Sequence, residues 1–271
     1  MTRDPMDVLP NGIVLLGCGK MGGAMLEGWL AGGLPPSRVC VIDPAPTDRL
    51  QALAAEGLAL NPDALPRADV CLLAVKPQFM ADALPAVAAL AAQGALFVSV
   101  AAGLTIRWFE AALGPASIVR CMPNTPAAVG KGITALFAND AAGEAGLAAA
   151  ETLLSAIGET VRLEAEGQMD AVTGVSGSGP AYVFHMIEAL AAAGEAEGLS
   201  PDLAMKLARA TVAGAGALAE AAEESAAQLR INVTSPKGTT AEGLAVLMPE
   251  LPDLMTRTVA AAAGRSRELA G

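Results

Sequence analysis

Three glycines near the start of the chain have the spacing of a phosphate-binding turn. Gly17, Gly19 and Gly22 follow the apolar run Ile13–Leu16 and precede a helix-forming stretch at residues 25–30. In such a turn the first glycine lets the strand end in a tight bend, the second lets the backbone approach a pyrophosphate, and the third lets the helix pack closely on the strand. The helix N-terminus then faces the phosphates. The spacing therefore predicts a site for a dinucleotide.

An acidic residue stands where such a site holds the adenine ribose. The second apolar run, Val39–Ile42, ends in Asp43, 21 residues after Gly22. An acid at that spacing binds the ribose hydroxyls. Glycine makes up 29 of the 271 residues, so a chance match is the alternative. The order of strand, glycines, helix, strand and acid favours the dinucleotide site.

Two later segments, residues 170–182 and 232–243, are rich in glycine and small hydroxyl residues. Within the second, residues 235–240 predict a turn followed by a helix start. Such a place offers backbone N–H groups and hydroxyls to a small carboxylate. Because Ser and Thr also cap ordinary helices, a plain cap is the alternative for either segment alone.

The elements that must position these residues change type near Leu163. Up to that point strand-like runs alternate with helix-length segments, which is typical of βαβ units and a mostly parallel sheet. Strands are predicted at residues 13–16, 39–42, 70–75, 95–100, 117–121, 132–137 and 159–163, with a helix at residues 143–157.

From Gln168 onward the apolar residues recur at helical spacing. Helices are predicted at residues 182–193, 203–219 and 254–263, and Ser200-Pro201 is a cap followed by proline at the first helical position. The predicted fold class is α/β: a Rossmann-type domain at residues 1–165, followed by an all-α domain for substrate binding and dimerisation at residues 166–271. Because helices so rich in Ala and Gly bury little area alone, we expect a homodimer through the C-terminal helices, or a higher homo-oligomer.

The charge and the cysteine spacing of the chain argue against nucleic acid and metal ions as partners. The chain has 17 Lys and Arg against 28 Asp and Glu, a formal charge of −11, which repels nucleic acid. Its four cysteines lack metal-ligand spacing, so no metal site is predicted, and they suit the core of a protein in a reducing compartment. They are Cys18, Cys40, Cys71 and Cys121.

Two segments indicate whether the protein is cytoplasmic, secreted or bound to a membrane. Residues 1–10 are acidic and contain proline, unlike a secretory signal, so a cytoplasmic protein is expected. Residues 83–106 lack charge and are long enough to span a bilayer, but Pro85 and the Gln93-Gly94 pair divide them. A helix that turns at Gln93-Gly94 into the strand at residues 95–100 is the better interpretation, so no membrane partner is expected.

Taken together, these features make the sequence closely resemble the sequences of the pyrroline-5-carboxylate reductases, which make proline by reducing a cyclic imine. The resemblance covers nearly the whole chain. Its two specific motifs are residues 170–182 and the Ser-Pro-x-Gly-Thr-Thr turn at residues 235–240. The others are Gly17-Cys18-Gly19-Lys20-Met21-Gly22, Ala74-Val75-Lys76-Pro77, Ala101-Ala102-Gly103 and Arg120-Cys121-Met122-Pro123-Asn124-Thr125-Pro126. Related β-hydroxyacid dehydrogenases share the first half of such a chain but are not expected to carry both specific motifs.

The resemblance implies residues for two sites. It places NADPH or NADH on Gly17, Cys18, Gly19, Lys20, Met21, Gly22, Asp43, Asn61, Ala74, Val75, Lys76, Pro77, Val100, Ala101, Ala102 and, from the helical domain, Asn232. It places the substrate on Glu166, Lys237, Gly238, Thr239 and Thr240. Thr240 and Ser235 are the implied catalytic residues, because the Thr240 hydroxyl meets the ring nitrogen and Ser235 supports the turn. A solvated surface acid is the alternative for Glu166.

These residues suit the reduction of an imine. A protonated imine is electrophilic without a strong protein acid, and the cofactor does the hard step, so the protein mainly orients the two. The one histidine, His185, lies on a helix stripe, where a core or surface role is expected more than catalysis. A hydroxyacid dehydrogenase usually needs a His or Lys as proton carrier. Lys76, at a strand end, is assigned to cofactor contact.

Two departures from the family pattern are informative. Where the family usually has glycine this chain has Lys237, which either adopts an ordinary backbone angle or costs about 1 kcal/mol at positive φ. Its ammonium could aid an anionic substrate. After the second strand the chain reads Asp43-Pro44-Ala45-Pro46, with Arg49 the only basic residue close by. Because a carboxylate there repels a 2′-phosphate, NADH is expected to serve at least as well as NADPH.

Two other function classes stay open at this point. One is another two-domain NAD(P)-dependent imine or β-hydroxyacid reductase, and the other is a non-catalytic nucleotide-binding protein of the same fold. The lack of a proton-carrying histidine disfavours hydroxyacids, and intact Ser235, Thr239 and Thr240 disfavour the non-catalytic class. Fold alone does not separate these classes, because sites carry function.

Overall fold

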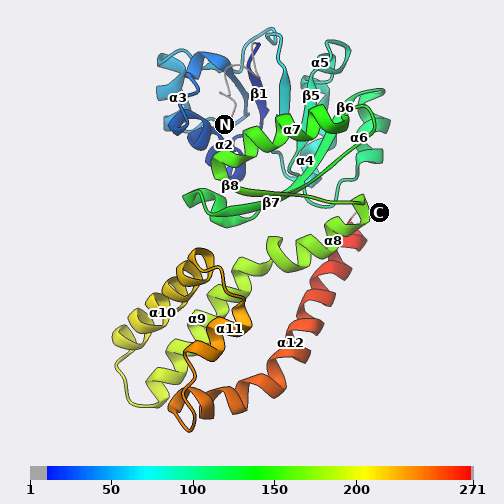
Figure 1. Ribbon diagram of the computed structural model, residues 1–271. Coiled ribbons are helices and arrows are strands. Elements are labelled where there is room, and N and C mark those ends of the chain that lie inside the picture. Colours follow the sequence, from blue (N-terminus) through cyan, green and yellow to red (C-terminus); the bar gives the residue numbers. More distant parts are fainter. Residues whose placement is uncertain (1–10, 270–271) are drawn as a thin grey trace. The chain divides into compact units, whose positions relative to one another are not determined.

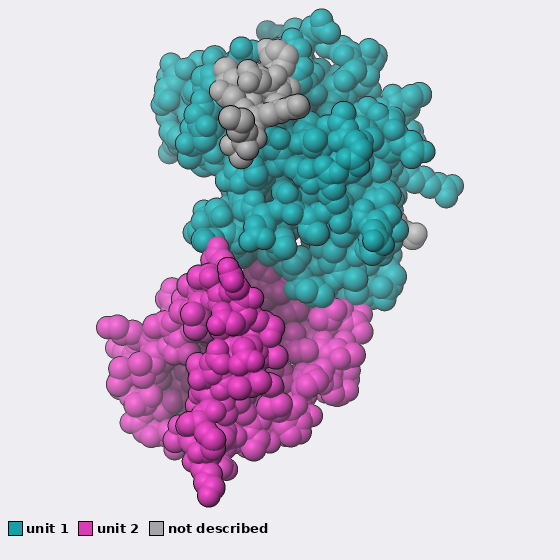
Figure 2. Space-filling view, in the orientation of Figure 1, with its two compact units in different colours: residues 1–177, 262–271 teal, residues 178–261 magenta. Residues whose placement is uncertain are grey.

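A computed structural model, shown in Figure 1, describes residues 11–269 of the chain. Two compact units make up the molecule, coloured separately in Figure 2: unit 1 comprises residues 1–177 and 262–271, and unit 2 comprises residues 178–261. Residues 166–177, which the sequence assigned to the helical domain, pack within unit 1. Residues 1–10, on which the expectation of no secretory signal depends, lie outside the described part.

Unit 1 is built on one sheet, which among the described residues has eight strands in the order β3-β2-β1-β4-β5-β6-β7-β8. All neighbouring strands are parallel except β6 and β7. Every residue of β1, β4 and β5 is buried, because helices cover both faces of this part of the sheet. The strands are β1 (Ile13–Leu16), β2 (Val39–Ile42), β3 (Ala59–Leu60), β4 (Val70–Leu73), β5 (Leu96–Ser99), β6 (Ser117–Met122), β7 (Gly132–Ala138) and β8 (Gly158–Arg162).

Two apolar clusters, one on each face of the sheet, form the core of unit 1. The first includes Met25 and Trp29, and the second includes Met80 and Phe109. These residues come from helices that lie against the strands in Figure 1. The α-helices are α2 (Lys20–Ala31), α3 (Asp48–Ala55), α4 (Pro77–Ala83), α5 (Ala89–Ala92), α6 (Ile106–Leu113), α7 (Gly143–Leu154) and α8 (Met169–Val172). The single turns are η1 (Pro36–Arg38), η2 (Leu84–Ala86), η3 (Thr125–Val129), η4 (Ser155–Ile157), η5 (Glu166–Gln168) and the π-helical η6 (Thr173–Gly177).

The predicted Rossmann-type sheet is confirmed: β1 and β2 have the predicted bounds, and the other predicted strands differ by one or two residues at an end. The two-residue strand β3 was not predicted, because a run that short gives no periodic signal. Residues 83–106 form the end of α4, η2, α5, a turn with Gly94 at φ +82°, and β5. Within residues 11–269 no helix is long and apolar enough to cross a membrane.

Unit 2 consists of helices joined by short non-helical segments, as predicted. Its helices are α9 (Gly179–Ala196), α10 (Pro201–Ala221), α11 (Ala226–Asn232) and α12 (Thr239–Leu269), of which α12 ends in unit 1. Ser200 is the N-cap residue of α10 and Pro201 its first residue, as the sequence indicated. The short α11 was not predicted.

Candidate active site

The glycine turn has the geometry that its spacing predicts. Gly17 has φ +85°, and a Cβ on it would lie 2.8 Å from the side chain of Val75. A Cβ on Gly22 would collide with the carbonyl oxygen of Gly17, so only glycine lets helix and strand approach this closely. A Cβ on Gly19 would meet no heavy atom within 4 Å, which leaves room beside the N-terminus of α2. These residues fit a dinucleotide pyrophosphate.

Asp43 is bound to the glycine turn through its carboxylate. Its Oδ2 accepts a hydrogen bond from the Cys18 N–H at 2.7 Å, and its Oδ1 accepts one from the Ala45 N–H at 2.8 Å. The side chain of Asn61 pairs with both backbone groups of Asp43, at 2.9 Å and 2.8 Å. Asn61 itself has φ 45°, a conformation that Asn tolerates better than most residues. The acid and the amide thus hold the ends of β1, β2 and β3 together.

Two further chain segments leave the same edge of the sheet. Residues 74–77 follow β4, with the Ala74 N–H bonded to Leu16 O at 2.8 Å and Lys76 exposed just before α4. Residues 100–102 follow β5, where the Val100 N–H donates to Leu73 O at 3.1 Å. The carboxyl ends of parallel strands meet at one edge, where ligands bind in such folds. Unit 1 therefore brings together every predicted cofactor residue except Asn232.

Two acids, Asp43 and Glu27, act on the Cys18 thiol of the glycine turn. Burial, followed by the charges of Asp43 and Glu27, raises the pKa of the Cys18 thiol to about 11, so this thiol is neutral at physiological pH. Arg49 donates two hydrogen bonds to Glu27, at 2.8 Å and 3.0 Å. These bonds lower the pKa of Glu27. The one basic side chain that the sequence offered to a 2′-phosphate is thus already paired with an acid.

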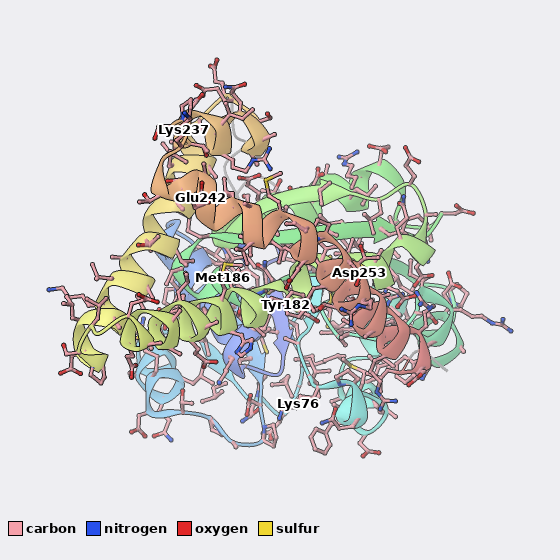
Figure 3. The ribbon with its side chains drawn as sticks, turned by 90° about the horizontal axis from the view of Figure 1, so that it is seen from below. Lys76, Tyr182, Met186, Lys237, Glu242 and Asp253 are labelled. Atoms are coloured by element: carbon pink, nitrogen blue, oxygen red, sulfur yellow. The ribbon has the colours of Figure 1, made fainter. Side chains whose placement is uncertain are left out.

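The predicted substrate turn lies in unit 2, between α11 and α12. The sequence left open whether Lys237 has an ordinary or a left-handed backbone angle. The structure shows the left-handed angle, with φ 60°. The Gly238 N–H donates to Ser235 O at 3.0 Å, and the Ala241 N–H to Gly238 O at 3.1 Å. Figure 3 labels Lys237 and Glu242 in this region. A tight turn here opens directly into α12 at Thr239.

Donor groups of this turn are available to a ligand. No hydrogen bond to another described residue is found for the hydroxyls of Ser235, Thr239 and Thr240. The first N–H groups of a helix lack intrahelical acceptors, and its N-terminus favours negative charge. Asn232, at the end of α11, accepts a hydrogen bond from Gln228 at 2.7 Å. The hydroxyls and first amides of α12 can therefore bind a small carboxylate.

Glu166 lies in unit 1, where its Oε1 is held by two donors. The Arg120 guanidinium donates to it at 2.8 Å and the Ile106 N–H at 2.9 Å. In the sequence, Arg120 was noted only as part of the motif at residues 120–126, and its ion pair with Glu166 was not predicted. The signal that could have found it is an arginine inside a strand that is otherwise apolar, since a buried guanidinium needs an acid partner.

The motif at residues 170–182 owes its first half to packing in unit 1. Asp170 accepts a hydrogen bond from Ser266 at 2.6 Å, and the Ser176 carbonyl accepts one from Asn124 at 3.2 Å. A Cβ on Gly177 would lie 2.7 Å from the Cε atom of Met122. These contacts explain why small and polar residues recur here. They form the segment that leads into unit 2.

The single histidine of the chain is on the surface of unit 2. The His185 side chain is 80% exposed and its Nδ1 lies 3.0 Å from Glu188 Oε2. Nothing in the geometry of its own unit gives it a reacting partner. Within residues 11–269 no group of three or more His, Cys, Asp or Glu is placed to hold a metal ion. The four cysteines are unpaired.

The sheet, its glycine turn and the acid after β2 define a nicotinamide-dinucleotide-dependent oxidoreductase, and comparisons with known proteins agree. Residues 12–103 match a family described as NADP oxidoreductase, coenzyme F420-dependent. Residues 166–269 match the family described as pyrroline-5-carboxylate reductase dimerisation. This second match starts at residue 166, which is also the first residue of the predicted helical domain.

Curated relatives narrow the class further. A pyrroline-5-carboxylate reductase of Pseudomonas aeruginosa is 40% identical over 95% of this chain and 96% of its own length. One from Arabidopsis thaliana is 36% identical over 94% of each chain. The chain belongs to the pyrroline-5-carboxylate reductase family.

Solved structures share the whole fold. A pyrroline-5-carboxylate reductase from Coxiella burnetii has a TM-score of 0.89 at 36% identity, covering 96% of this chain and 99% of its own. A pyrroline carboxylate reductase from Plasmodium falciparum, crystallised with NADP bound, has a TM-score of 0.80 at 26% identity, covering 96% and 98%.

Proposed function

We propose that this chain reduces 1-pyrroline-5-carboxylate to L-proline with NAD(P)H, the final step of proline biosynthesis. One observation carries the proposal: a single chain of this family holds an intact dinucleotide turn at residues 17–22 and a Ser-Pro-x-Gly-Thr-Thr turn whose hydroxyls have no partner among the described residues. The first turn suits a hydride-donating cofactor. The second suits a small cyclic amino acid.

The substrate turn has two tasks in this reaction. The first amides of α12 bind the carboxylate, and the Thr240 hydroxyl meets the ring nitrogen, while Ser235 supports the turn. The remaining proposed substrate residues are Lys237, Gly238 and Thr239. Glu166, which the resemblance also gave, is bound by Arg120 and by the Ile106 N–H, and is assigned a different role below. The imine arrives protonated, so its carbon is already electrophilic and no side chain has to act as a strong acid. Orientation then supplies most of the protein's share of catalysis.

The cofactor site uses the remaining predicted residues. The bound nicotinamide supplies the hydride. Residues 17–22 and Asn61 would hold the pyrophosphate and adenosine half, and residues 74–77 and 100–102 the nicotinamide half, with Asn232 as a further contact. The Asp43 carboxylate, at the position after β2, would repel a 2′-phosphate, and Arg49 is paired with Glu27. NADH is therefore the proposed preference, or at least the equal of NADPH.

The small amount of apolar surface that unit 2 buries supports dimerisation through its helices. Among its described residues the buried apolar ones are Ala191, Ala204 and Ala208. Many large apolar side chains are exposed instead, among them Phe184 at 59% and Val246 at 70%. Exposure on this scale marks an interaction surface. A second copy packed on α9 to α12 would bury these side chains.

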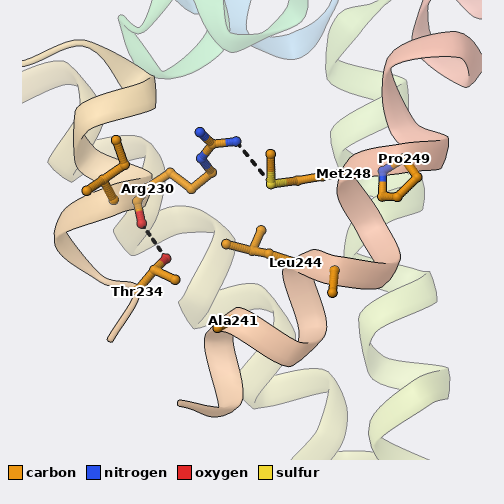
Figure 4. Close-up of a pocket in the computed structure, with 8 residues that line it drawn as sticks. Arg230, Thr234, Ala241, Leu244, Met248 and Pro249 are labelled. Atoms are coloured by element: carbon orange, nitrogen blue, oxygen red, sulfur yellow. Dashed lines mark hydrogen bonds between the residues drawn. The ribbon is translucent and has the colours of Figure 1, made fainter. Parts of the chain in front are cut away.

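A hollow between α11 and α12 supports the same interface. Its volume is about 410 Å³, and Figure 4 shows Arg230 reaching over it to the sulfur of Met248 at 3.3 Å. The lining is largely apolar: Arg230, Ile231, Thr234, Ala241, Leu244, Ala245, Met248 and Pro249. An apolar side chain of the partner would fill it.

A cytoplasmic location is proposed because the four cysteines are unpaired, as is usual in a reducing compartment.

A spectrophotometric assay tests the proposed function. Purified protein is mixed with pyrroline-5-carboxylate and NADH or NADPH, and the nicotinamide absorbance band is followed. We expect it to fall with formation of proline, and expect no reduction of NAD⁺ with a β-hydroxyacid in the reverse direction. Turnover of the hydroxyacid alone would favour the β-hydroxyacid reductase alternative. Cofactor binding without turnover of either compound would favour the non-catalytic alternative.

A further inference from the structure

Arg120 is a buried cation to which the proposed reaction assigns no role. Its side chain is 5% exposed, and its guanidinium lies 2.8 Å from Glu166. In the register of β5 and β6, Arg120 stands opposite Ser99, the last residue of β5. It is therefore at the carboxyl edge of the sheet, where a fold of this kind binds its dinucleotide.

Glu166 connects this arginine to the loop that follows β5. The oxygen that accepts from Arg120 also accepts from the N–H of Ile106, the first residue of α6, at 2.9 Å. A carboxylate at this position also meets the positive end of the helix dipole. The ion pair thus fixes the point at which loop 100–105 enters α6.

The other end of this loop is fixed independently. The Ala101 N–H donates to the Ser99 hydroxyl at 3.3 Å. In the middle of the loop, Gly103 has φ +80°, and a Cβ on it would lie 3.4 Å from Leu269. With the Glu166 contact in place, the loop is held at both ends and packed in its middle. Its backbone is therefore presented in one conformation to whatever binds at the edge of the sheet.

We propose that Arg120 and Glu166 are positioning residues that hold loop 100–105 so that residues 100–102 orient the nicotinamide ring for hydride transfer. This inference depends on the proposed function for the identity of the ring. The adenosine half is held elsewhere, by the glycine turn, so loss of the pair affects orientation more than affinity. A displacement of about 1 Å in a reacting group can cost on the order of 100-fold in rate.

The test uses E166A and the double variant R120M/E166M. The double variant leaves no unpaired charge in the buried position, so it keeps the test valid if E166A folds poorly. We first measure the fluorescence of bound NADH, which reports the surroundings of its nicotinamide ring. The change in emission on binding should be lost in both variants, while the Kd for NADH stays within about threefold, because the adenosine contacts are intact.

Kinetics give a second set of readouts, of which KM and the isotope effect do not change when part of the protein is unfolded. With pyrroline-5-carboxylate, kcat should fall by at least about tenfold while KM for the imine stays within about threefold. The isotope effect with [4,4-²H₂]NADH should increase, because hydride transfer becomes more strongly rate-limiting. E151A is the matched control, since it removes an acid from the exposed Arg162 pair in the same unit. It should change neither readout.

Wild-type emission and isotope effect in both variants would overturn the proposal. So would a selective rise in KM for the imine with unchanged emission, since Glu166 would then be a direct substrate ligand. If the wild type binds NADH but does not reduce the imine, the proposed function fails. The emission comparison still decides whether Arg120 and Glu166 position the ring.

Discussion

A Cβ on Gly238 would collide with the hydroxyl oxygen of Ser235. The two residues also share a hydrogen bond, from the Gly238 N–H to the Ser235 carbonyl oxygen at 3.0 Å. Only a residue without a side chain lets the hydroxyl lie this close to the backbone at the start of α12. The shape of the proposed substrate turn therefore depends on glycine at position 238.

Gly238→Ala should reduce catalysis without affecting the cofactor. The added methyl group displaces the Ser235 side chain, so kcat/KM for the imine should fall by about 10- to 100-fold, or roughly 1.4–2.8 kcal/mol. The Kd for NADH, measured by fluorescence titration, should not change. Gly243→Ala is the control on the same helix, because a Cβ there meets no heavy atom within 4 Å. Full activity of Gly238→Ala would contradict the role of the turn.

Thr240→Ala should lower kcat by on the order of 100-fold, because the substrate nitrogen loses its hydroxyl partner. Cofactor affinity should change little. Thr240→Ser keeps the hydroxyl and should restore most of the activity in the same steady-state assay. If the alanine variant were fully active, Thr240 would have no part in the mechanism.

Lys237→Gly should stabilise the turn, because Lys237 has φ 60°. Relief of this conformation is worth up to about 1 kcal/mol, partly offset by the greater freedom of glycine in the unfolded chain. The free energy of unfolding from urea titration should therefore rise by less than about 1 kcal/mol. Lys237→Asn tolerates the same angle without the charge. If the ammonium aids the anionic substrate, both variants should show the same severalfold rise in KM, and an unchanged KM would exclude that contact.

Cofactor preference should follow the charges around Asp43. We expect kcat/KM with NADH to equal or exceed that with NADPH. Asp43→Ser removes the charge but keeps an oxygen for the Cys18 N–H, and should shift the ratio toward NADPH by on the order of tenfold. Glu27→Gln weakens the hold on Arg49 and should shift the ratio in the same direction. A wild-type enzyme with a much larger kcat/KM for NADPH would show this interpretation to be wrong.

Phe184→Asp should disrupt the dimer. Phe184 is 59% exposed on α9, so in the proposed dimer it is buried and a carboxylate there would be desolvated. Sedimentation should show a dimer or higher oligomer for the wild type and a dissociated or unfolded chain for the variant. Phe79→Asp is the control, since Phe79 is equally exposed, at 56%, on α4 of unit 1. A stable folded monomer of the wild type at micromolar concentration would contradict the interface.

Local sequence patterns were enough to predict the parallel strands and the glycine turn of this protein. Four-residue apolar runs such as Ile13–Leu16 predicted the parallel strands, because strands covered on both faces must be apolar throughout. The glycine spacing predicted the tight bend at Gly17, where φ is +85°, and the close packing of helix on strand at Gly22. The role of Asp43 was only partly foreseen. Its two hydrogen bonds to the N–H groups of Cys18 and Ala45 depend on how β2 ends beside β1.

Contacts between segments far apart in the chain could not be predicted in the same way. The ion pair between Glu166 and Arg120, which lies 46 residues away in the chain, was not predicted from the sequence. Residues 166–177 have a helical sequence but pack with the sheet. In each case the partner is chosen by the fold, and no short-range pattern records it.

The amino-acid sequence by itself determined the order of strands and helices, the dinucleotide turn and the motifs that place the chain in its family, because these features depend on residues close together in the chain. Only the tertiary structure decided the left-handed angle of Lys237, the pairing of Arg49 with Glu27, and the attachment of loop 100–105 through Glu166 and Arg120. The physical reason is that a left-handed angle at a residue other than glycine is tolerated only when the surrounding structure holds it, and that side chains far apart in the chain are brought within reach of each other only by the fold.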